Sequence, residues 1–279
     1  CTFMPKRVII NADDFGITRG VNRAIAELAA AKAISSTTVM ANMDEYIEIA
    51  ALKNDIGIGV HCNLTVGRPA AAPGSVPTLV NTEGCFFRLN ELLQRMRQGK
   101  VSARDIAVEL TAQLQRLLDL GISPDHFDSH QSLLKYPFFI KIIKKIASEH
   151  NIRAVRTYVQ RKFDYRRLLS PRSIIISLFL ALEKRRWKNA GFSVADRQDS
   201  LLQFGLTPEK ALQKLGEIFS GLPKGVLELA VHPGYCTDKN QLLGAYVFER
   251  EIEAQVLKSA DFKKILKASG AQLIRFSDL

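Results

Sequence analysis

Four short polar patches, far apart in the chain, carry side chains that can bind a metal ion or move a proton. They are Asp13-Asp14, His61, Asp128-Ser129-His130 and His232. Each patch ends an apolar run, as expected at the end of a buried strand. If these runs are parallel strands of an α/β barrel, their carboxyl ends share one rim, which is where active sites form. One carboxylate and two imidazoles meeting there could hold a divalent ion with positions left open.

The Asp13-Asp14 pair offers two carboxylates with different tasks. Adjacent strand residues point to opposite sides, but both can face the rim where the chain turns. One could then bind the ion while the other acts as a general base on water. The alternative is that the pair only caps the helix that follows.

The histidines also have functional and structural interpretations. His61 is either a ligand or a hydrogen-bonded core residue, and Asp128 and His130 share one side of their strand. His126 lies lower in that strand, so we expect a structural role. His232 precedes Pro233-Gly234, a rigid turn that would hold its ring at a fixed angle, as a general acid requires.

The elements that must position these residues alternate along the chain. Strands are expected over 6–12, 36–41, 57–63, 125–129, 152–158, 200–204, 226–231 and 272–276, and helices over 18–32, 44–53, 89–99, 102–120, 138–150, 207–220 and 248–258. This order predicts an α/β fold, a distorted (β/α) TIM-like barrel with seven or eight mainly parallel strands. A doubly wound open sheet is the alternative. The loop 67–87, rich in proline and glycine, is a candidate lid.

The overall composition is that of a globular protein. The chain has 279 residues, 47% hydrophobic and 24% charged, which predicts a single domain over 1–279. Its four cysteines are scattered, which argues against a disulfide framework and predicts a cytoplasmic location. The first residues are too few and too polar for a signal peptide, and no apolar run is long enough to span a bilayer.

Positive charge is concentrated in one part of the chain. Of a net charge of +11, residues 151–190 contribute eleven Lys or Arg against two acidic residues. A local patch of this kind predicts contact with an anionic group and no nucleic-acid binding. Within a basic, apolar insertion at about 160–198, the apolar run 174–182 is followed by basic residues and Trp187. Residues 168–188 could contact a membrane or glycolipid peripherally, or form a core or homodimer helix.

These patches resemble a known family, the YdjC-like carbohydrate deacetylases, which include chitooligosaccharide and hopanoid-biosynthesis-associated enzymes. The motifs are Ala-Asp-Asp-Phe-Gly, Gly-Val-His-Cys-Asn-Leu-Thr, Phe-Asp-Ser-His-Gln and His-Pro-Gly-Tyr, in the family's order. The resemblance implies a distorted barrel, with Asp14, His61 and His130 as metal ligands, Asp13 as catalytic base and His232 as second catalytic histidine. Cys62, in place of the usual aliphatic residue, and the long insertion are departures.

The sequence therefore predicts a metal-dependent hydrolase that removes an N-acetyl group from an acetylated sugar and releases acetate. The substrate would be an oligosaccharide or glycolipid containing N-acetylglucosamine, and the cofactor one magnesium or zinc ion. Weaker candidates for substrate binding are Asn63, Asp128, Arg156 and Tyr235. A sugar-phosphate phosphoesterase and a non-catalytic sugar- or lipid-binding module are the alternatives.

Overall fold

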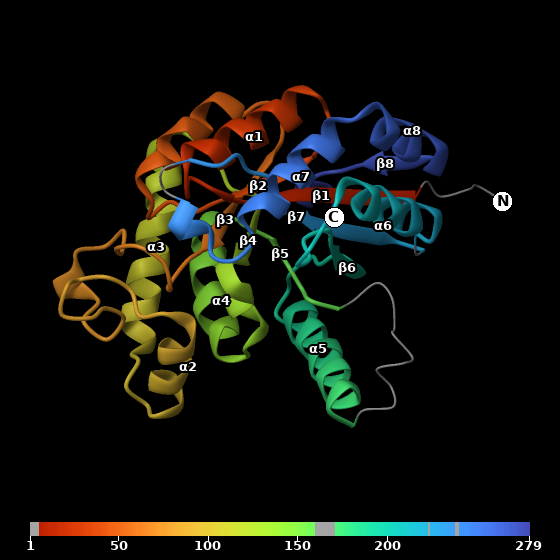
Figure 1. Ribbon diagram of the computed structural model, residues 1–279. Coiled ribbons are helices and arrows are strands. Elements are labelled where there is room, and N and C mark those ends of the chain that lie inside the picture. The colour runs from red at the N-terminus through yellow and green to blue at the C-terminus, as the bar shows by residue number, and fades with distance from the viewer. Residues whose placement is uncertain (1–5, 160–170, 223, 238–239) are drawn as a thin grey trace.

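A curved parallel sheet forms the centre of the protein (Figure 1). The computed structural model describes residues 6–159, 171–222, 224–237 and 240–279. The strands follow the order β5-β4-β3-β2-β1-β7-β6, with β8 paired to the start of β1, and these pairings are all parallel. Their bounds are β1 Lys6–Phe15, β2 Ser36–Val39, β3 Gly57–Cys62, β4 His126–Ser129, β5 Ala154–Val155, β6 Arg197–Ser200, β7 Val226–Val231 and β8 Ala271–Leu273.

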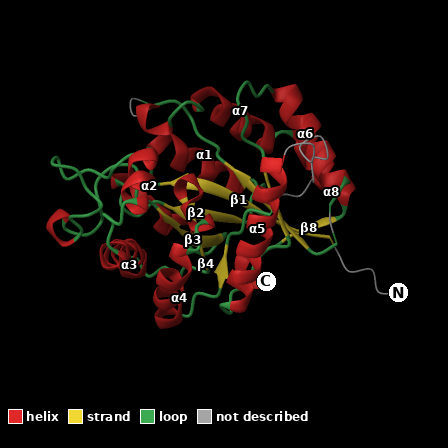
Figure 2. Ribbon diagram, turned by 90° about the horizontal axis from the view of Figure 1, so that it is seen from below, coloured by secondary structure: helices red, strands yellow, loops and turns green. Residues whose placement is uncertain are grey.

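Helices surround this sheet (Figure 2). The α-helices are α1 Arg19–Ala30, α2 Leu89–Arg97, α3 Ala103–Asp119, α4 Phe138–His150, α5 Pro171–Asn189, α6 Pro208–Ser220, α7 Val247–Lys258 and α8 Ala260–Ser269. Short 3₁₀ helices are η1 Asp44–Leu52, η2 Pro73–Ser75, η3 His130–Lys135, η5 Asn240–Leu243 and η6 Phe276–Asp278. The alternation of strands and helices is that of a (β/α) barrel.

The barrel is distorted because its edges barely meet. The edge strands β5 and β6 are not neighbours in the sheet, and an isolated bridge from Ala154 to Ser193 links β5 to the segment that precedes β6. The sheet therefore curls into a half-barrel, which confirms the predicted fold class. All six residues of β3 and of β7 are buried, as expected for strands covered on both faces.

Two glycines allow the close contacts that align the strands carrying the polar patches. A Cβ on Gly59 would lie 2.4 Å from Cε1 of His126, so β3 and β4 can pair side by side only without one. A Cβ on Gly20 would lie 2.1 Å from the carbonyl oxygen of Tyr235, where the turn after β7 meets α1. Substitution at either position would push these segments apart.

Several predicted boundaries were wrong. The sixth strand spans Arg197–Ser200 and not 200–204, because it is a polar strand defined by its pairing with β7 rather than by an apolar run. The fifth strand is reduced to Ala154–Val155, and the last covers Ala271–Leu273 instead of 272–276. Helix α8, which Ser259 caps, was not predicted. Of the basic insertion, residues 160–170 lie outside the described residues.

Candidate active site

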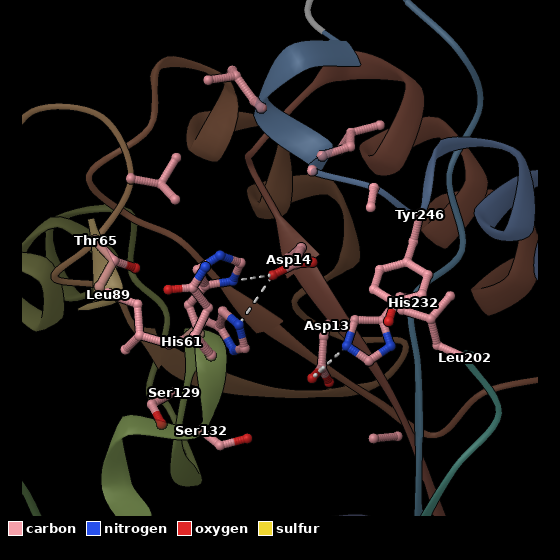
Figure 3. A pocket seen from close by; sticks show the side chains of 18 of the residues that line it. Asp13, Asp14, His61, Thr65, Leu89, Ser129, Ser132, Leu202, His232 and Tyr246 are labelled. Atoms are coloured by element: carbon pink, nitrogen blue, oxygen red, sulfur yellow. Dashed lines mark hydrogen bonds and ion pairs between the residues drawn. The ribbon is translucent and has the colours of Figure 1, made fainter. Parts of the chain in front are cut away.

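The turn at the end of β1 brings both aspartates into one pocket (Figure 3). Asp14 has a φ of 70°, in the left-handed region, and the register of β1 against β2 shifts between Ala12 and Phe15. This irregularity breaks the alternation that would otherwise send neighbouring side chains to opposite faces. Both carboxylates are almost completely buried, so each must have polar partners.

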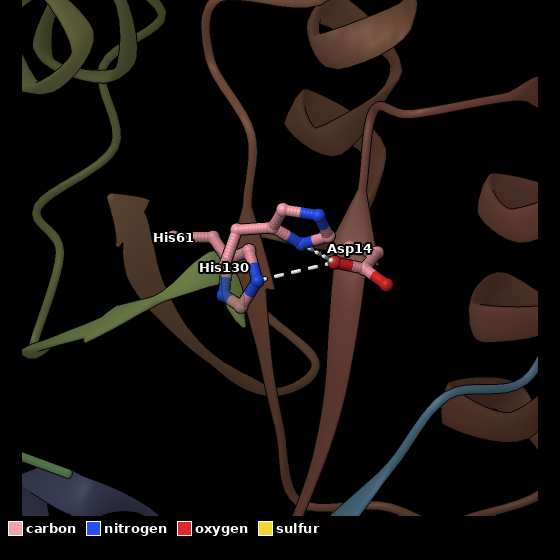
Figure 4. Close-up of side chains that lie close together, drawn as sticks. All are labelled: Asp14, His61 and His130. Carbon is pink, nitrogen blue, oxygen red and sulfur yellow. Dashed lines mark hydrogen bonds and ion pairs between the residues drawn. The ribbon is translucent and has the colours of Figure 1, made fainter. Parts of the chain in front are cut away.

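One oxygen of Asp14 faces two imidazoles that come from the ends of other strands (Figure 4). Its Oδ1 is 3.1 Å from Nε2 of His61, at the end of β3, and 2.9 Å from Nδ1 of His130, directly after β4. Atoms about 2.1 Å from one ion are about 3.0 Å apart at right angles and about 3.4 Å apart in a tetrahedron. The structure thus brings together the three residues predicted as ligands, at a spacing that suits one divalent ion.

A second group of possible ligands, Asp13, His61 and Asp128, also lies within reach of a common ion. It is the weaker candidate because Nη1 of Arg156 is 2.6 Å from Asp13 and 2.8 Å from Asp128. A guanidinium already between two carboxylates leaves no room for a cation there. Among the described residues no guanidinium lies between the donors of Asp14, His61 and His130, since Arg250 binds the other oxygen of Asp14, so this set fits the ion better.

Asp128 controls the tautomer and orientation of His61. Its Oδ1 is 2.6 Å from Nδ1 of His61, and its Oδ2 accepts a hydrogen bond from Thr38 at 3.0 Å. A proton held on Nδ1 leaves the lone pair of Nε2 free to bind a metal. A carboxylate such as that of Asp128 is a usual hydrogen-bond partner of a histidine ligand. Asp128 is completely buried and does not line the pocket, so its predicted role in substrate binding is replaced by one in orienting His61.

We expect metal binding to release about one proton, because His61 is an imidazolium in the ion-free site. Burial alone would lower the pKa of His61, but Asp128 and then Asp14 raise it to about 10. A metal needs the Nε2 electron pair, so the Nε2 proton must leave. Affinity should therefore rise with pH, by up to about tenfold per unit below the pKa. Calorimetric titration with zinc in buffers of different ionisation enthalpy measures the released proton, and a buffer-independent heat would contradict the prediction.

Arg156 holds the carboxylate of Asp13 in place. From the sequence alone, a base beside a metal would be expected to be unpaired, and the structure shows that Asp13 is paired. Nη1 and Nη2 of Arg156 donate to its two oxygens at 2.6 and 2.7 Å. Arg156 also pairs with Asp128 and with Glu228 of β7. Burial alone would raise the pKa of Asp13, but the charge of Arg156 and its hydrogen bonds hold that pKa below its usual value. Asp13 is therefore ionised, as a general base must be.

His232 faces Asp13 across the pocket (Figure 3). Its Nε2 is 3.4 Å from Oδ2 of Asp13, and its backbone N–H donates to Glu253 of α7. Burial lowers the pKa of His232, with Asp13 opposing the shift. The ring is thus neutral near pH 7 and can take up a proton that arrives at Asp13. Nδ1 of His232 has no hydrogen-bond partner among the described residues.

Arg250 of α7 is a site residue that the sequence did not reveal. Its Nη2 donates to Oδ2 of Asp14 at 2.7 Å, the oxygen that does not face the histidines. Burial would raise the pKa of Asp14, but Arg250 and then His130 hold it well below its usual value. Arg250 is 4% exposed, lines the pocket, and leaves Nε and Nη1 without a partner within the described part of the chain. No strand-end pattern marks it, because it comes from a helix.

The pocket around these groups has a volume of about 1050 Å³. Beside the charged residues it is lined by aromatic and aliphatic side chains, among them Phe86, Leu89, Tyr158, Leu202 and Tyr246. Polar groups at the base and apolar walls are the usual composition of a small-molecule site. Its size allows more than one sugar ring to enter.

Two predicted substrate-binding residues do not line this pocket. Asn63 is completely buried and its amide holds the turn that follows β3, through Thr65 and Val66. The hydroxyl of Tyr235 donates to Glu27 of α1 at 2.6 Å. Both side chains therefore stabilise the segments around the site, and we no longer assign them to substrate binding. Arg156 lines the pocket, but its guanidinium is occupied by acidic partners.

The long loop 67–87 is hydrogen-bonded to α3, so it forms a fixed wall of the pocket rather than a lid. The carboxylate of Glu109 accepts hydrogen bonds from the backbone of Ala70 and Ala71, and Asp105 accepts two from Thr78. These bonds tie the loop to α3 at two places. Phe86 from the end of the loop lines the pocket.

Comparison with known proteins identifies the family. A family model described as YdjC-like protein matches residues 7–268. The chain belongs to the YdjC-like family. The match covers all the site residues described above, which lie between Asp13 and Glu253.

Curated relatives of this YdjC-like protein carry deacetylase names. A carbohydrate deacetylase of Clostridium beijerinckii is 26% identical over 278 residues, 98% of this chain and 100% of the relative. A chitooligosaccharide deacetylase of Yersinia enterocolitica is 30% identical over 282 residues, 99% of this chain and 100% of the relative. A carbohydrate deacetylase of Geobacillus stearothermophilus is 41% identical over 159 residues, 55% of this chain and 62% of the relative.

Solved structures show the same fold for the YdjC-like chain. An Enterococcus faecalis protein provisionally named for cellobiose-phosphate cleavage superposes with a TM-score of 0.79 at 24% identity, over 99% of both chains. A Streptococcus mutans CE4 esterase superposes with a TM-score of 0.51 at 11% identity, over 97% of this chain and 86% of the other. At these identities the likeness concerns the fold alone.

Proposed function

We propose that this protein is a metal-dependent hydrolase that removes an acetyl group from the nitrogen of an acetylated sugar. The observation that carries the proposal is the Asp14, His61 and His130 set with Asp13 and His232 beside it in one pocket. Three ligands leave positions on the ion open for water and a carbonyl oxygen. The deacetylase names of relatives that align over the whole chain support the same chemistry.

The bound ion would lower the pKa of a water molecule and polarise the acetyl carbonyl. Asp13 accepts the proton of the attacking water, and Arg156 keeps its carboxylate ionised and fixed in position. His232 receives that proton across the 3.4 Å to Asp13 and delivers it to the leaving amine. Arg250 holds one oxygen of Asp14, so the other is left for the ion.

The pocket and the names of the relatives support a sugar as the substrate. Tyr246 and Phe86 offer aromatic faces to an apolar face of a sugar ring, and the neighbouring polar groups can bind hydroxyls. An N-acetylglucosamine unit within an oligosaccharide or glycolipid is the substrate we favour. We further propose zinc or magnesium as the ion and the cytoplasm as the location, where Cys62 and Cys85 would stay reduced as the thiols seen here.

We expect the protein to release acetate from N-acetylated sugars, and to stop when a chelator removes the ion. A panel of N-acetylglucosamine, its β-linked oligomers and a lipid-linked form, assayed for acetate with and without chelator and after metal is added back, measures this. The same panel as sugar phosphates, assayed for phosphate, tests the phosphoesterase alternative. Phosphate release without acetate release would overturn the proposal.

A further inference from the structure

Helix α5 projects from the body of the protein and is anchored at its C-terminal end (Figure 1). Trp187 is completely buried and packs edge to face on Phe192, with ring centroids 5.2 Å apart. Nζ of Lys184 donates to the backbone of Asp196 at 2.6 Å. Trp187 is therefore an anchor to the body and not an aromatic residue at a surface. The N-terminal half of the helix is the part that projects.

This projecting half exposes large apolar side chains. The exposed fractions are 40% for Ile174, 66% for Ile175, 48% for Ile176, 59% for Leu178 and 52% for Leu182. Successive helix residues are about 100° apart, so Ile174, Ile175, Leu178 and Leu182 lie within an arc of about 100°, and Ile176 lies about 100° beyond it. This stripe lies on the side of the helix opposite the buried Glu183 and Trp187, so it faces away from the body, whereas a surface helix normally turns its apolar stripe to the core. The core-helix interpretation of this segment is therefore wrong.

The charge of α5 is positive, and most of its basic residues follow the apolar part. Arg185, Arg186 and Lys188 are exposed, and Glu183, the acidic residue of this helix, is buried. These basic residues follow Ile175 by 10 to 13 positions, or about 15–20 Å along the axis. Arg172 stands two positions before Ile174, so the apolar stripe has basic residues before and after it in the chain. A helix that lies in the membrane interface, with this stripe toward the acyl chains, keeps the basic residues at both ends at the level of the headgroups.

We propose that α5 docks this protein on an anionic lipid membrane, with residues 174–182 dipping into one leaflet and the basic residues on the headgroups. An exposed apolar stripe with basic residues beside it is the pattern of a helix that lies in the membrane interface. Anionic headgroups also complement Arg185, Arg186 and Lys188. In the described part of the chain, no helix is long and apolar enough to cross a membrane, so the contact is peripheral.

The α5 surface is separate from the pocket, since none of the described residues that line the pocket comes from α5. Docking and hydrolysis can therefore be tested independently. Failure of the membrane proposal leaves activity on a water-soluble sugar unchanged, and failure of the hydrolase proposal leaves binding to vesicles unchanged.

The test is sedimentation of the full-length protein with vesicles of phosphatidylcholine alone, or of equal parts of phosphatidylcholine and phosphatidylglycerol. We expect binding to the anionic vesicles that weakens as salt is raised. The double variant I175E/L178E should reduce the partition coefficient at least about 100-fold. The variant R185Q/R186Q should reduce it about 5-fold per residue on anionic vesicles and little on neutral ones.

The matched control is Ile47→Glu, which changes a similarly exposed isoleucine (57%) on η1 and should bind vesicles as the unmodified protein does. Circular dichroism and activity on a soluble substrate show that the variants are folded. Absence of binding to anionic vesicles at low salt would overturn the proposal. So would full binding by I175E/L178E. A concentration-dependent dimer in lipid-free buffer that this variant abolishes would assign α5 to contact with a second copy instead.

Discussion

The variant Asp13→Asn is expected to lower kcat roughly 10²- to 10⁴-fold while the metal content stays unchanged. An amide has nearly the shape of the carboxylate and can still accept a hydrogen bond from Arg156, but it cannot take a proton from water. Asp13 lies outside the Asp14, His61 and His130 set, so the ion should bind as before. The measurements are acetate release at saturating sugar and elemental analysis of the same preparation.

The control for this prediction is Asp119→Asn, which removes an exposed carboxylate on α3 and should leave both quantities unchanged. If Asp13→Asn kept most of the turnover, Asp13 could not be the base. If it instead lost the ion, the second possible ligand group, which contains Asp13, would become the better metal site. The two results are distinguished by metal content alone.

The variant His130→Gln is expected to lose most of its bound metal and more than about 100-fold of its activity. Loss of an outer partner of a ligand already costs about 10- to 100-fold in affinity, and loss of a ligand should cost more. His130 is a good choice because it is 13% exposed at the pocket and directly follows β4, so its replacement disturbs little packing. Metal affinity is measured by competition with a chromophoric chelator.

His150→Gln is the matched histidine control, at the C-terminal end of α4 and away from the pocket. It should retain both metal and activity. Excess zinc should restore part of the activity of His130→Gln, because Asp14 and His61 remain. Unchanged metal affinity in His130→Gln would show that this imidazole is not a ligand, and the metal site would have to be drawn from other residues.

The charges of the buried aspartates explain why two arginines lie beside them in the site. Asp13, Asp14 and Asp128 are buried and close together, and without cations beside them their negative charges would repel one another. Arg156 pairs with Asp13 and Asp128, while Arg250 pairs with Asp14. Once His61 has lost its proton, two guanidinium groups against three carboxylates leave an excess of negative charge. That excess favours a divalent cation beside His61 and His130.

Glu228 and Glu253 are buried acids whose pKa values are raised. Burial raises the pKa of Glu228 to about 7, although Arg156 opposes the shift, and burial raises the pKa of Glu253 to about 8. Glu253 therefore accepts the N–H of His232 as a largely protonated group at neutral pH. Neither residue adds a full negative charge to the pocket below these pH values, which limits the repulsion around Asp13.

The sequence by itself determined which histidines and aspartates would meet, and the kind of chemistry they could do. Asp14, His61 and His130 each end an apolar run, and parallel strands deliver such ends to one rim whatever their exact length. The central strands were predicted well for the same reason, because their apolar runs are long and covered on both faces. The edge strands β5 and β6 were not, because they are short or polar and are defined by pairing.

Only the tertiary structure decided which arginines pair with the aspartates of the site and which apolar side chains stay exposed to solvent. Arg156 and Arg250 reach Asp13 and Asp14 across 143 and 236 positions of the chain, and such pairings depend on sheet curvature and helix placement rather than on local pattern. The exposure of α5 also depends on the tertiary structure, because a run of isoleucines has the same sequence pattern in a core helix and in a projecting helix. Burial is a property of the packed chain, so it was the packing that left those side chains exposed.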